Sequence, residues 1–231
     1  MHNKFLRLSF ILVTNQYYMA KIPDGILGKF LGKAGPVTGY MRNGENLLRT
    51  SSRRKDNLIT PKRTAQQQKI KVCNEFTKAF SGTGFFNKTF PAYGDSGTGY
   101  NRATSAVMNL AITGSYPSIA IAYPLVLISK GPLPAAEYAA AEVTNEGNIF
   151  FNWTDNTGTG TAKADDLVIL LAYFPERNEI IYSFSAATRA DCHALLDTSI
   201  LKGQVAETWL SLLSKDEKDS ANSVYIGKME L

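Results

Sequence analysis

The chain has 231 residues, of which 44% are hydrophobic and 11% aromatic, a composition that excludes an intrinsically disordered protein and leaves room for one large domain or two small ones. Its net charge of +5 conceals two opposite halves: residues 1–102 carry 17 Lys and Arg against 5 Asp and Glu, whereas residues 103–231 carry 8 against 15. A basic half suits nucleic acid, a membrane surface, an acidic neighbouring subunit or the chain's own acidic half, and solvated charge or self-assembly is the favoured interpretation.

The first eighteen residues resemble a secretion signal only in outline. A basic start precedes an apolar run over residues 5–13, but Arg7 and Ser9 interrupt the run and no small-x-small cleavage site follows. Met19 is a plausible native start, so we expect residues 1–18 to be an upstream extension. No window reaches the roughly 20 apolar residues of a membrane-spanning helix, so no membrane span is expected and no compartment is assigned.

Residues 28–71 are rich in glycine and in basic side chains. Asn43-Gly44 lies between two short apolar runs, a pattern typical of a type I′ turn, and predicts a β-hairpin over residues 36–50. The spacing Gly28-x-x-x-Gly32-Lys33-Ala34 fails as a phosphate-binding loop, because the first glycine is one residue too close and Ala34 replaces the Ser or Thr that holds magnesium. The glycines therefore indicate turns.

Two helices are predicted after the hairpin. Thr60 and Pro61 supply an N-cap and a first helical residue, which predicts a helix over residues 61–80. Its apolar residues recur at helical spacing, and Lys62, Gln66 and Lys69 are expected on another face. A second helix is predicted over residues 100–112, with Ala103, Val107 and Leu110 on one stripe. The phenylalanines between the helices, Phe85, Phe86 and Phe90, are expected in the core.

Strand patterns dominate the remainder of the chain. Residues 149–154 alternate apolar and polar side chains, and residues 167–174 are apolar on both faces, as in a central strand. Further strands are predicted over residues 180–184, 205–214 and 223–229. The fold class expected is α+β: a basic hairpin-and-helix unit over residues 19–130, followed by an acidic antiparallel β-sandwich over residues 131–231.

Two resemblances follow from these patterns. Residues 137–230 resemble a fibronectin type III-like, immunoglobulin-type sandwich, with Trp153 at the place of its early core tryptophan and Trp209 at the place of its later tyrosine. The chain from Met19 onward is also similar to a family of bacterial proteins of unknown function. That similarity rests on residues 25–28, 60–61 with 66–68, 114–117, 129–131, 153–156 and 222–227. It implies a common fold and brings no known activity or site residues.

The candidates for chemistry are few. Cys73 and Cys192 share no disulfide or metal-ligand spacing, and each is expected to pack as a small apolar residue. Asp191-Cys192-His193 is a poor nucleophile–base set, because neighbouring residues of a strand point to opposite faces. The carboxylates Asp155, Asp165 and Asp166 bracket a loop and could supply oxygen ligands to a calcium ion. Their spacing in the sequence is not that of a known calcium-binding loop, so a solvated turn is the favoured alternative.

No catalytic residue, metal or cofactor is therefore predicted. We expect a non-catalytic structural or interaction protein, with a phage-like or appendage-like component that associates with its own copies as the specific hypothesis. The alternative is a nucleic-acid-binding module, and an unrecognised enzyme comes third. The candidate binding residues, which form the expected basic surface, are Arg42, Arg49, Arg53, Arg54, Lys55, Lys62, Arg63 and Lys69.

Overall fold

A computed structural model describes residues 22, 28–42, 44–50, 59–94 and 97–231 of the chain. The chain divides into two compact units, Met1–Leu58 and Ile59–Leu231. The sequence pattern predicts a change of unit at residue 130, whereas this division lies between Leu58 and Ile59. The reason is that the helices after Ile59 and the sheets that follow them share a core.

The first unit contains a three-stranded antiparallel sheet in the order β1-β2-β3. Its strands are β1 (Gly32–Ala34), β2 (Val37–Arg42) and β3 (Glu45–Thr50). The pairing of β2 with β3 ends with Arg42 opposite Glu45, and Gly44 has a φ of 84°, the left-handed region that the type I′ turn requires. The hairpin therefore forms where the sequence predicts it, and β1 is an additional strand.

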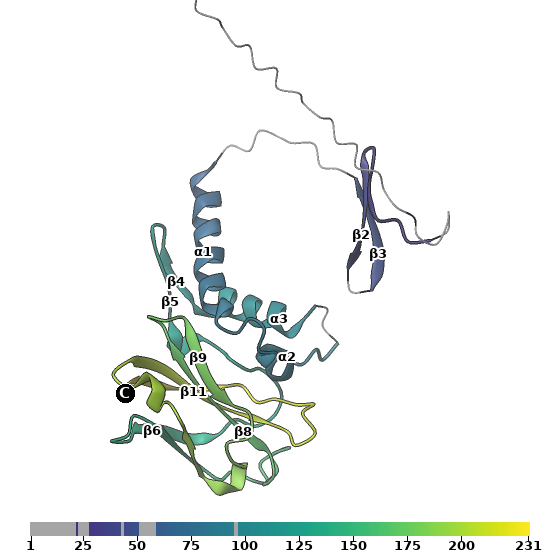
Figure 1. Ribbon diagram of the computed structural model, residues 1–231. Helices are drawn as coiled ribbons and strands as arrows, with labels where there is room; N and C mark the ends of the chain where they lie inside the picture. The colour runs from purple at the N-terminus through teal and green to yellow at the C-terminus, as the bar shows by residue number, and fades with distance from the viewer. Residues whose placement is uncertain (1–21, 23–27, 43, 51–58, 95–96) are drawn as a thin grey trace, which may run out of the picture. The chain divides into compact units, whose positions relative to one another are not determined.

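The second unit begins with helices (Figure 1). They are α1 (Pro61–Lys78), α2 (Phe85–Thr89) and α3 (Gly99–Ala106), which continues into a π-helical turn over Val107–Ala111. The Thr60 side chain accepts a hydrogen bond from the Arg63 amide at 3.3 Å, so the predicted N-cap is confirmed. The phenylalanines of the helical segment are buried, as expected.

Antiparallel strands make up most of the second unit, and among the residues that the structure describes 38% are in strands and 23% in helices. The four-stranded sheet, in the order β12-β11-β8-β9, consists of β8 (Leu167–Phe174), β9 (Glu179–Ser183), β11 (Val205–Leu213) and β12 (Val224–Glu230). The three-stranded sheet, in the order β10-β7-β6, consists of β6 (Glu137–Val143), β7 (Ile149–Thr154) and β10 (His193–Leu196). A separate hairpin joins β4 (Ile112–Ser115) to β5 (Ser118–Ile121).

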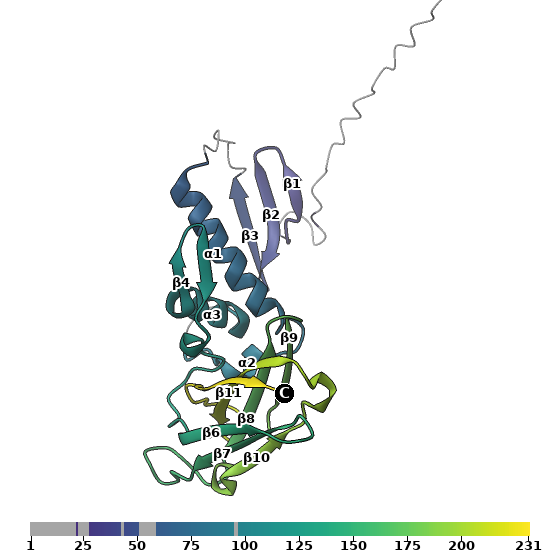
Figure 2. The same cartoon turned by 90° about the vertical axis from the view of Figure 1, so that its left-hand side faces the viewer.

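The four-stranded sheet is the middle of three layers (Figure 2). One face carries Ile169, Leu171 and Trp209, which pack with the helices, and the other carries Leu170 and Leu210, which pack with the three-stranded sheet. Both faces of the sheet are buried: β8 is apolar along its whole length, and β11 is buried at every position after Val205. The helices therefore form the third layer and share one core with the four-stranded sheet.

The two tryptophans lie in different layers of this core. Trp153 faces the interior between the sheets and donates its indole N–H to the Arg189 carbonyl at 2.7 Å. Trp209 is fully buried, but it faces the helices and donates to the Val126 carbonyl at 3.1 Å. It thus differs from a tyrosine of an inter-sheet core, because helices cover this outer sheet face.

The second helix departs from its predicted stripe at one position. Ala103 and Val107 are buried as expected, whereas Leu110 is 50% exposed and Ala111 is buried in its place. The π-helical turn over Val107–Ala111 explains the difference, since its wider turn advances the buried stripe by one residue. Leu110 therefore projects from the helix.

Candidate interaction surfaces

The predicted basic residues fall in separate parts of the molecule. Arg42 and Arg49 lie on the sheet of the first unit, where the Arg49 guanidinium carbon is 5.6 Å from the centre of the Tyr40 ring, a cation–π geometry. The other described members belong to α1 in the second unit, and they are Lys62, Arg63 and Lys69. Arg53, Arg54 and Lys55 lie outside the described residues. The five described members therefore divide between the two units, two on the sheet of the first and three on α1 of the second.

The α1 cations do not lie on a separate helix face, contrary to expectation. At about 100° per residue, Lys62 and Lys69 fall within about 40° of the buried Cys73 and Phe76. They remain accessible because only the second half of α1 packs on the core. The first turns of the helix extend beyond the rest of the unit, with the β4–β5 hairpin beside them (Figure 1).

The projecting part of α1 and the hairpin form one structure, which we call the basic arm, residues 59–74 and 112–121. The Gln68 side-chain amide donates to the Pro117 carbonyl at 2.6 Å and so ties the helix to the turn of the hairpin. Residues 59–74 carry four Lys and Arg without a carboxylate, and residues 112–121 carry no charge. Ile59, Ile70 and Tyr116 of the arm are 78%, 42% and 52% exposed.

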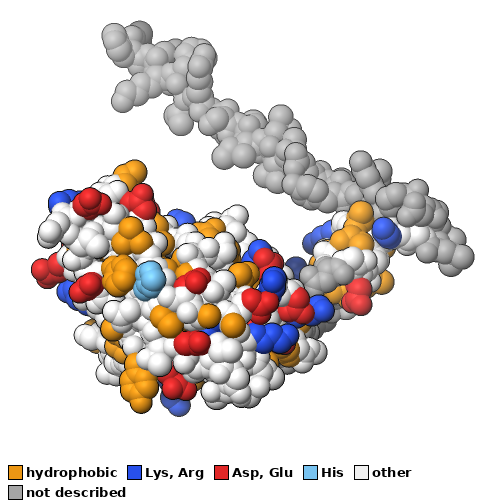
Figure 3. Space-filling model, turned by 90° about the horizontal axis from the view of Figure 1, so that it is seen from below, with side chains coloured by type: hydrophobic (Ala, Val, Ile, Leu, Met, Phe, Trp, Pro, Cys, Tyr) orange, Lys and Arg blue, Asp and Glu red, His pale blue; other side chains and the backbone are white. Residues whose placement is uncertain are grey.

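The opposite side of the second unit is acidic. The outer surface of the three-stranded sheet and the loops at its ends, residues 137–155 and 191–202, hold six Asp and Glu and a single lysine, Lys202. We call this surface the acidic face. Figure 3 shows this side, where orange and red side chains surround the pale-blue histidine. Leu195 and Tyr138 are 52% and 84% exposed there, and His193 stacks on Phe150 with ring centres 5.9 Å apart.

Asp191 and Cys192 of the Asp191-Cys192-His193 segment form hydrogen bonds to residues close to them in the sequence. The Asp191 carboxylate accepts hydrogen bonds from the Thr188 amide and hydroxyl at 2.7 and 2.8 Å, and these bonds lower the pKa of that carboxyl. Cys192 precedes β10 in a left-handed conformation and donates its thiol to the Ala190 carbonyl. The three side chains therefore do not form a nucleophile–base relay. Cys73 is fully buried, as expected, whereas Cys192 is half-buried.

The carboxylates of the 155–166 loop also have separate partners. Asp155 accepts from the hydroxyl and amide of Thr157, which lower its pKa, and Asp165 forms an ion pair with Lys215 at 3.2 Å. Asp166 is fully buried. In the part of the chain that the structure describes, no group of three or more His, Cys, Asp and Glu is arranged to hold a metal ion.

The prediction of a solvated turn is therefore wrong at Asp166, because Asp166 is buried and forms an ion pair with a buried arginine, Arg189. Arg189 donates from Nε to Asp166 Oδ2 at 3.0 Å and from Nη2 to the Pro134 carbonyl at 3.0 Å, and the Nη2 atom also lies 3.0 Å from Asp166 Oδ2 as an ion pair. Its Nη1 donates to the Asn156 side-chain oxygen. No sequence pattern indicates this pair, since Arg189 is 23 residues from Asp166 and lies in no recognisable motif.

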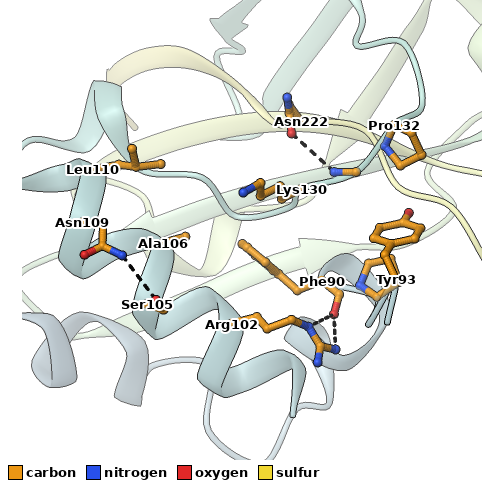
Figure 4. A pocket seen from close by; sticks show the side chains of 12 residues that line it. Phe90, Tyr93, Arg102, Ser105, Ala106, Asn109, Leu110, Lys130, Pro132 and Asn222 are labelled. Carbon is orange, nitrogen blue, oxygen red and sulfur yellow. Dashed lines mark hydrogen bonds between the residues drawn. The ribbon is translucent and has the colours of Figure 1, made fainter. Parts of the chain in front are cut away.

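A pocket of about 620 Å³ lies on another side of the second unit (Figure 4). Its walls come from the loop at Phe90 and Tyr93, from α3 and the π-helical turn, and from residues 130–132 and 222. Lys130 and Arg102 are the charged residues in its lining. The Arg102 guanidinium is oriented by bonds to the Phe90 and Gly97 carbonyls at 2.6–3.0 Å.

The segments that carried the family resemblance meet at junctions of the fold. The Gln68–Pro117 bond joins two of them in the basic arm, and Asn156 belongs to the cluster around Arg189. A third junction lies beside the pocket, where the Gly131 amide donates to the Asn222 side chain and the Ser223 amide donates to the Ser129 carbonyl. These residues therefore explain how the chain folds without indicating a reaction.

The chain belongs to a family of proteins of unknown function (DUF6266), whose model matches residues 29–227. The predicted start motif at residues 25–28 lies outside the matched residues. No curated protein matches the chain. Among the described residues, no helix is long and apolar enough to cross a membrane.

Proposed function

We propose that this member of the family is a non-catalytic interaction protein that associates head to tail with further copies of itself. In this proposal the basic arm of one copy binds the acidic face of the next. The observation that carries it is the separation of charge within one packed unit: four cations without a carboxylate on residues 59–74, and six carboxylates with one lysine on the opposite layer.

Charge complementarity alone raises the rate at which two proteins associate more than it raises the affinity of their complex. The two surfaces also present apolar side chains for a contact that excludes water. Ile59 and Tyr116 are exposed on the arm, and Leu195 and Ile200 are 52% and 85% exposed on or beside the acidic face. An interface of this composition, with apolar residues inside a charged rim, resembles stable protein–protein contacts.

The contact would be heterologous, because the arm and the acidic face are different surfaces of the same chain. A heterologous contact repeats along an assembly and gives rings if the rotation closes or filaments if it does not. The specific form proposed from the sequence, a phage-like or appendage-like component, would use such a repeated contact.

The test compares two charge-reversed variants by light scattering after size-exclusion chromatography. Lys62→Glu/Arg63→Glu changes the arm, and a glutamate at the third helical position would complete a capping box with Thr60, so α1 is expected to stay folded. Glu142→Lys/Glu146→Lys changes the acidic face. We expect wild-type assemblies at about 50 mM NaCl that dissociate at about 500 mM, and monomers for each variant alone.

Mixing the two variants makes the test specific. Each retains one intact surface, so an equimolar mixture is expected to recover association, through the intact arm of one variant and the intact acidic face of the other. The control Lys163→Glu/Lys228→Glu also reverses two exposed lysines, but outside the arm, and is expected to assemble like the wild type. A wild-type protein that stays monomeric at high concentration and low salt, or variants that assemble normally, would refute the proposal.

Nucleic acid is the alternative partner of the basic arm. A fluorescently labelled oligonucleotide tested by anisotropy with wild type and Lys62→Glu/Arg63→Glu separates the two. Binding that weakens steeply with salt and is lost in the variant, from a protein that stays monomeric, would replace self-association with nucleic-acid binding.

We also propose that the two sheets form a fibronectin type III-like sandwich. Seven antiparallel strands in sheets of four and three, with Trp153 between them, support this assignment. An experimental structure of residues 59–231 tests it through the strand connections.

A further inference from the structure

We infer that the pocket beside the π-helical turn binds a small organic anion with a flat apolar body. The pocket has a volume of about 620 Å³, within the range of ligand sites in proteins. It lies apart from the basic arm and the acidic face, and the inference stands independently of the proposed self-association.

The π-helical turn gives the pocket one of its walls. Such turns are rare and occur frequently at functional sites. Here the turn moves Leu110 off the buried stripe, so that Asn109 and Leu110 line the pocket while Ala111 takes the core position. An uninterrupted α-helix would continue the stripe of Ala103 and Val107 through Leu110 and bury that side chain. The wall therefore depends on the π-helical turn.

The lining is positive. Lys130 and Arg102 contribute two cations, and no carboxylate among the described residues lines the pocket. Arg102 is held in place by two backbone carbonyls, whereas none of the ion pairs found among the described residues includes Lys130. Figure 4 shows the Lys130 side chain lying across the pocket between Asn222 and Phe90. A ligand anion would neutralise this lysine.

The remaining walls are apolar and flat. Phe90, Tyr93, Pro132 and Leu110 supply two rings, a pyrrolidine and an aliphatic side chain. Aromatic walls favour planar groups that stack against them or meet their edges. A ligand with a ring system and a carboxylate, sulfonate or phosphate group would satisfy both the rings and Lys130.

The pocket is also firmly built on the side of residues 130–132. A Cβ at Gly131 would collide with the Ser220 carbonyl oxygen and lie 2.8 Å from the Tyr93 hydroxyl, so only glycine fits there. The Ser220 hydroxyl bonds to the Thr89 and Lys130 carbonyls at 3.0 and 2.8 Å, and its amide donates to the Tyr93 hydroxyl. These bonds fix three segments that are distant in the sequence, at residues 89–93, 130 and 220. A ligand therefore loses little affinity to the cost of ordering the pocket.

The experiment uses 8-anilinonaphthalene-1-sulfonate as the probe, followed by its fluorescence and by amide chemical shifts of the full chain. We expect saturable binding, with shifts concentrated at Phe90, Leu110 and Asn222. Lys130→Gln is expected to weaken binding about tenfold or more, since it removes a charge-assisted contact. Lys163→Gln, a change at another exposed lysine, is expected to leave the affinity unchanged.

The neutral probe N-phenyl-1-naphthylamine distinguishes the contribution of the Lys130 charge to binding from that of the apolar walls. Its binding is expected to be insensitive to Lys130→Gln and to be lost in Leu110→Glu. Shifts that spread over the acidic face instead of the pocket, or equal affinities of wild type and Lys130→Gln for the sulfonate, would overturn the inference. Self-association of Lys130→Gln should equal that of the wild type, so a failure of one proposal leaves the other intact.

Discussion

The Arg189 guanidinium and the Asp166 carboxylate form an ion pair at 3.0 Å in which both side chains are fully buried. Arg189 also bonds to Asn156 and to the Pro134 carbonyl, so one side chain fixes the 155–166 loop, the entry to β6 and the entry to β8. Buried charges of this kind are tolerated only when paired and hydrogen-bonded. The pair therefore positions loops at one end of the two sheets.

Removing Arg189 should be costly, because it leaves the Asp166 charge buried without its partner. We expect Arg189→Met to lower the free energy of unfolding by about 3–5 kcal/mol in urea denaturation. The control is Arg177→Met, which breaks the solvent-exposed pair with Glu179 and should leave the urea midpoint close to that of the wild type. Similar losses in the two variants would contradict a structural role for the buried pair.

The Asp216 side chain should contribute to the loss of folded-state stability at low pH. Hydrogen bonds from the Ser214 hydroxyl and from Lys218 lower the pKa of Asp216 to about 2. A carboxylate with a depressed pKa stabilises the folded state above its ordinary pKa of 3.8, and this contribution disappears as the pH falls toward 2. Carboxyl NMR titration is expected to show a higher Asp216 pKa in Ser214→Ala, and an unchanged value would contradict the assigned cause.

Two positions of α1 should differ sharply. Phe76 is buried against Tyr173 of the four-stranded sheet, with ring centres 5.0 Å apart, whereas Ile70 is 42% exposed. We expect Phe76→Ala to cost about 3–5 kcal/mol, and Ile70→Ala to stay within about 0.5 kcal/mol. Thermal unfolding followed by circular dichroism measures both, and a large loss for Ile70→Ala would mean that the projecting part of α1 is packed.

The shared core predicts which fragments fold. Residues 131–231 alone would expose the face of the four-stranded sheet that holds Ile169, Leu171 and Trp209, so this fragment is expected to aggregate or remain unfolded. Residues 59–231 are expected to give dispersed amide spectra and a single unfolding transition. A folded, monomeric 131–231 fragment would instead support the boundary that the sequence suggested.

Local pattern by itself determined much of the secondary structure. The turn at Gly44 and the cap at Thr60 use bonds between near neighbours, and α1 begins at Pro61 as predicted. The alternation of β7 and the continuous apolar run of β8 likewise indicate strands with one and two buried faces. These features depend on short-range physics, which a single sequence contains.

Only the tertiary structure decided where several of the side chains discussed above lie. Arg189 reaches Asp166 across 23 residues, and Leu110 turns outward because the core accepts Ala111 through a π-helical turn. Lys62 and Lys69 lie on the same face of α1 as Cys73, and they are accessible because the first turns of α1 extend beyond the core. Each outcome depends on what packs against an element, which periodicity along the chain does not encode.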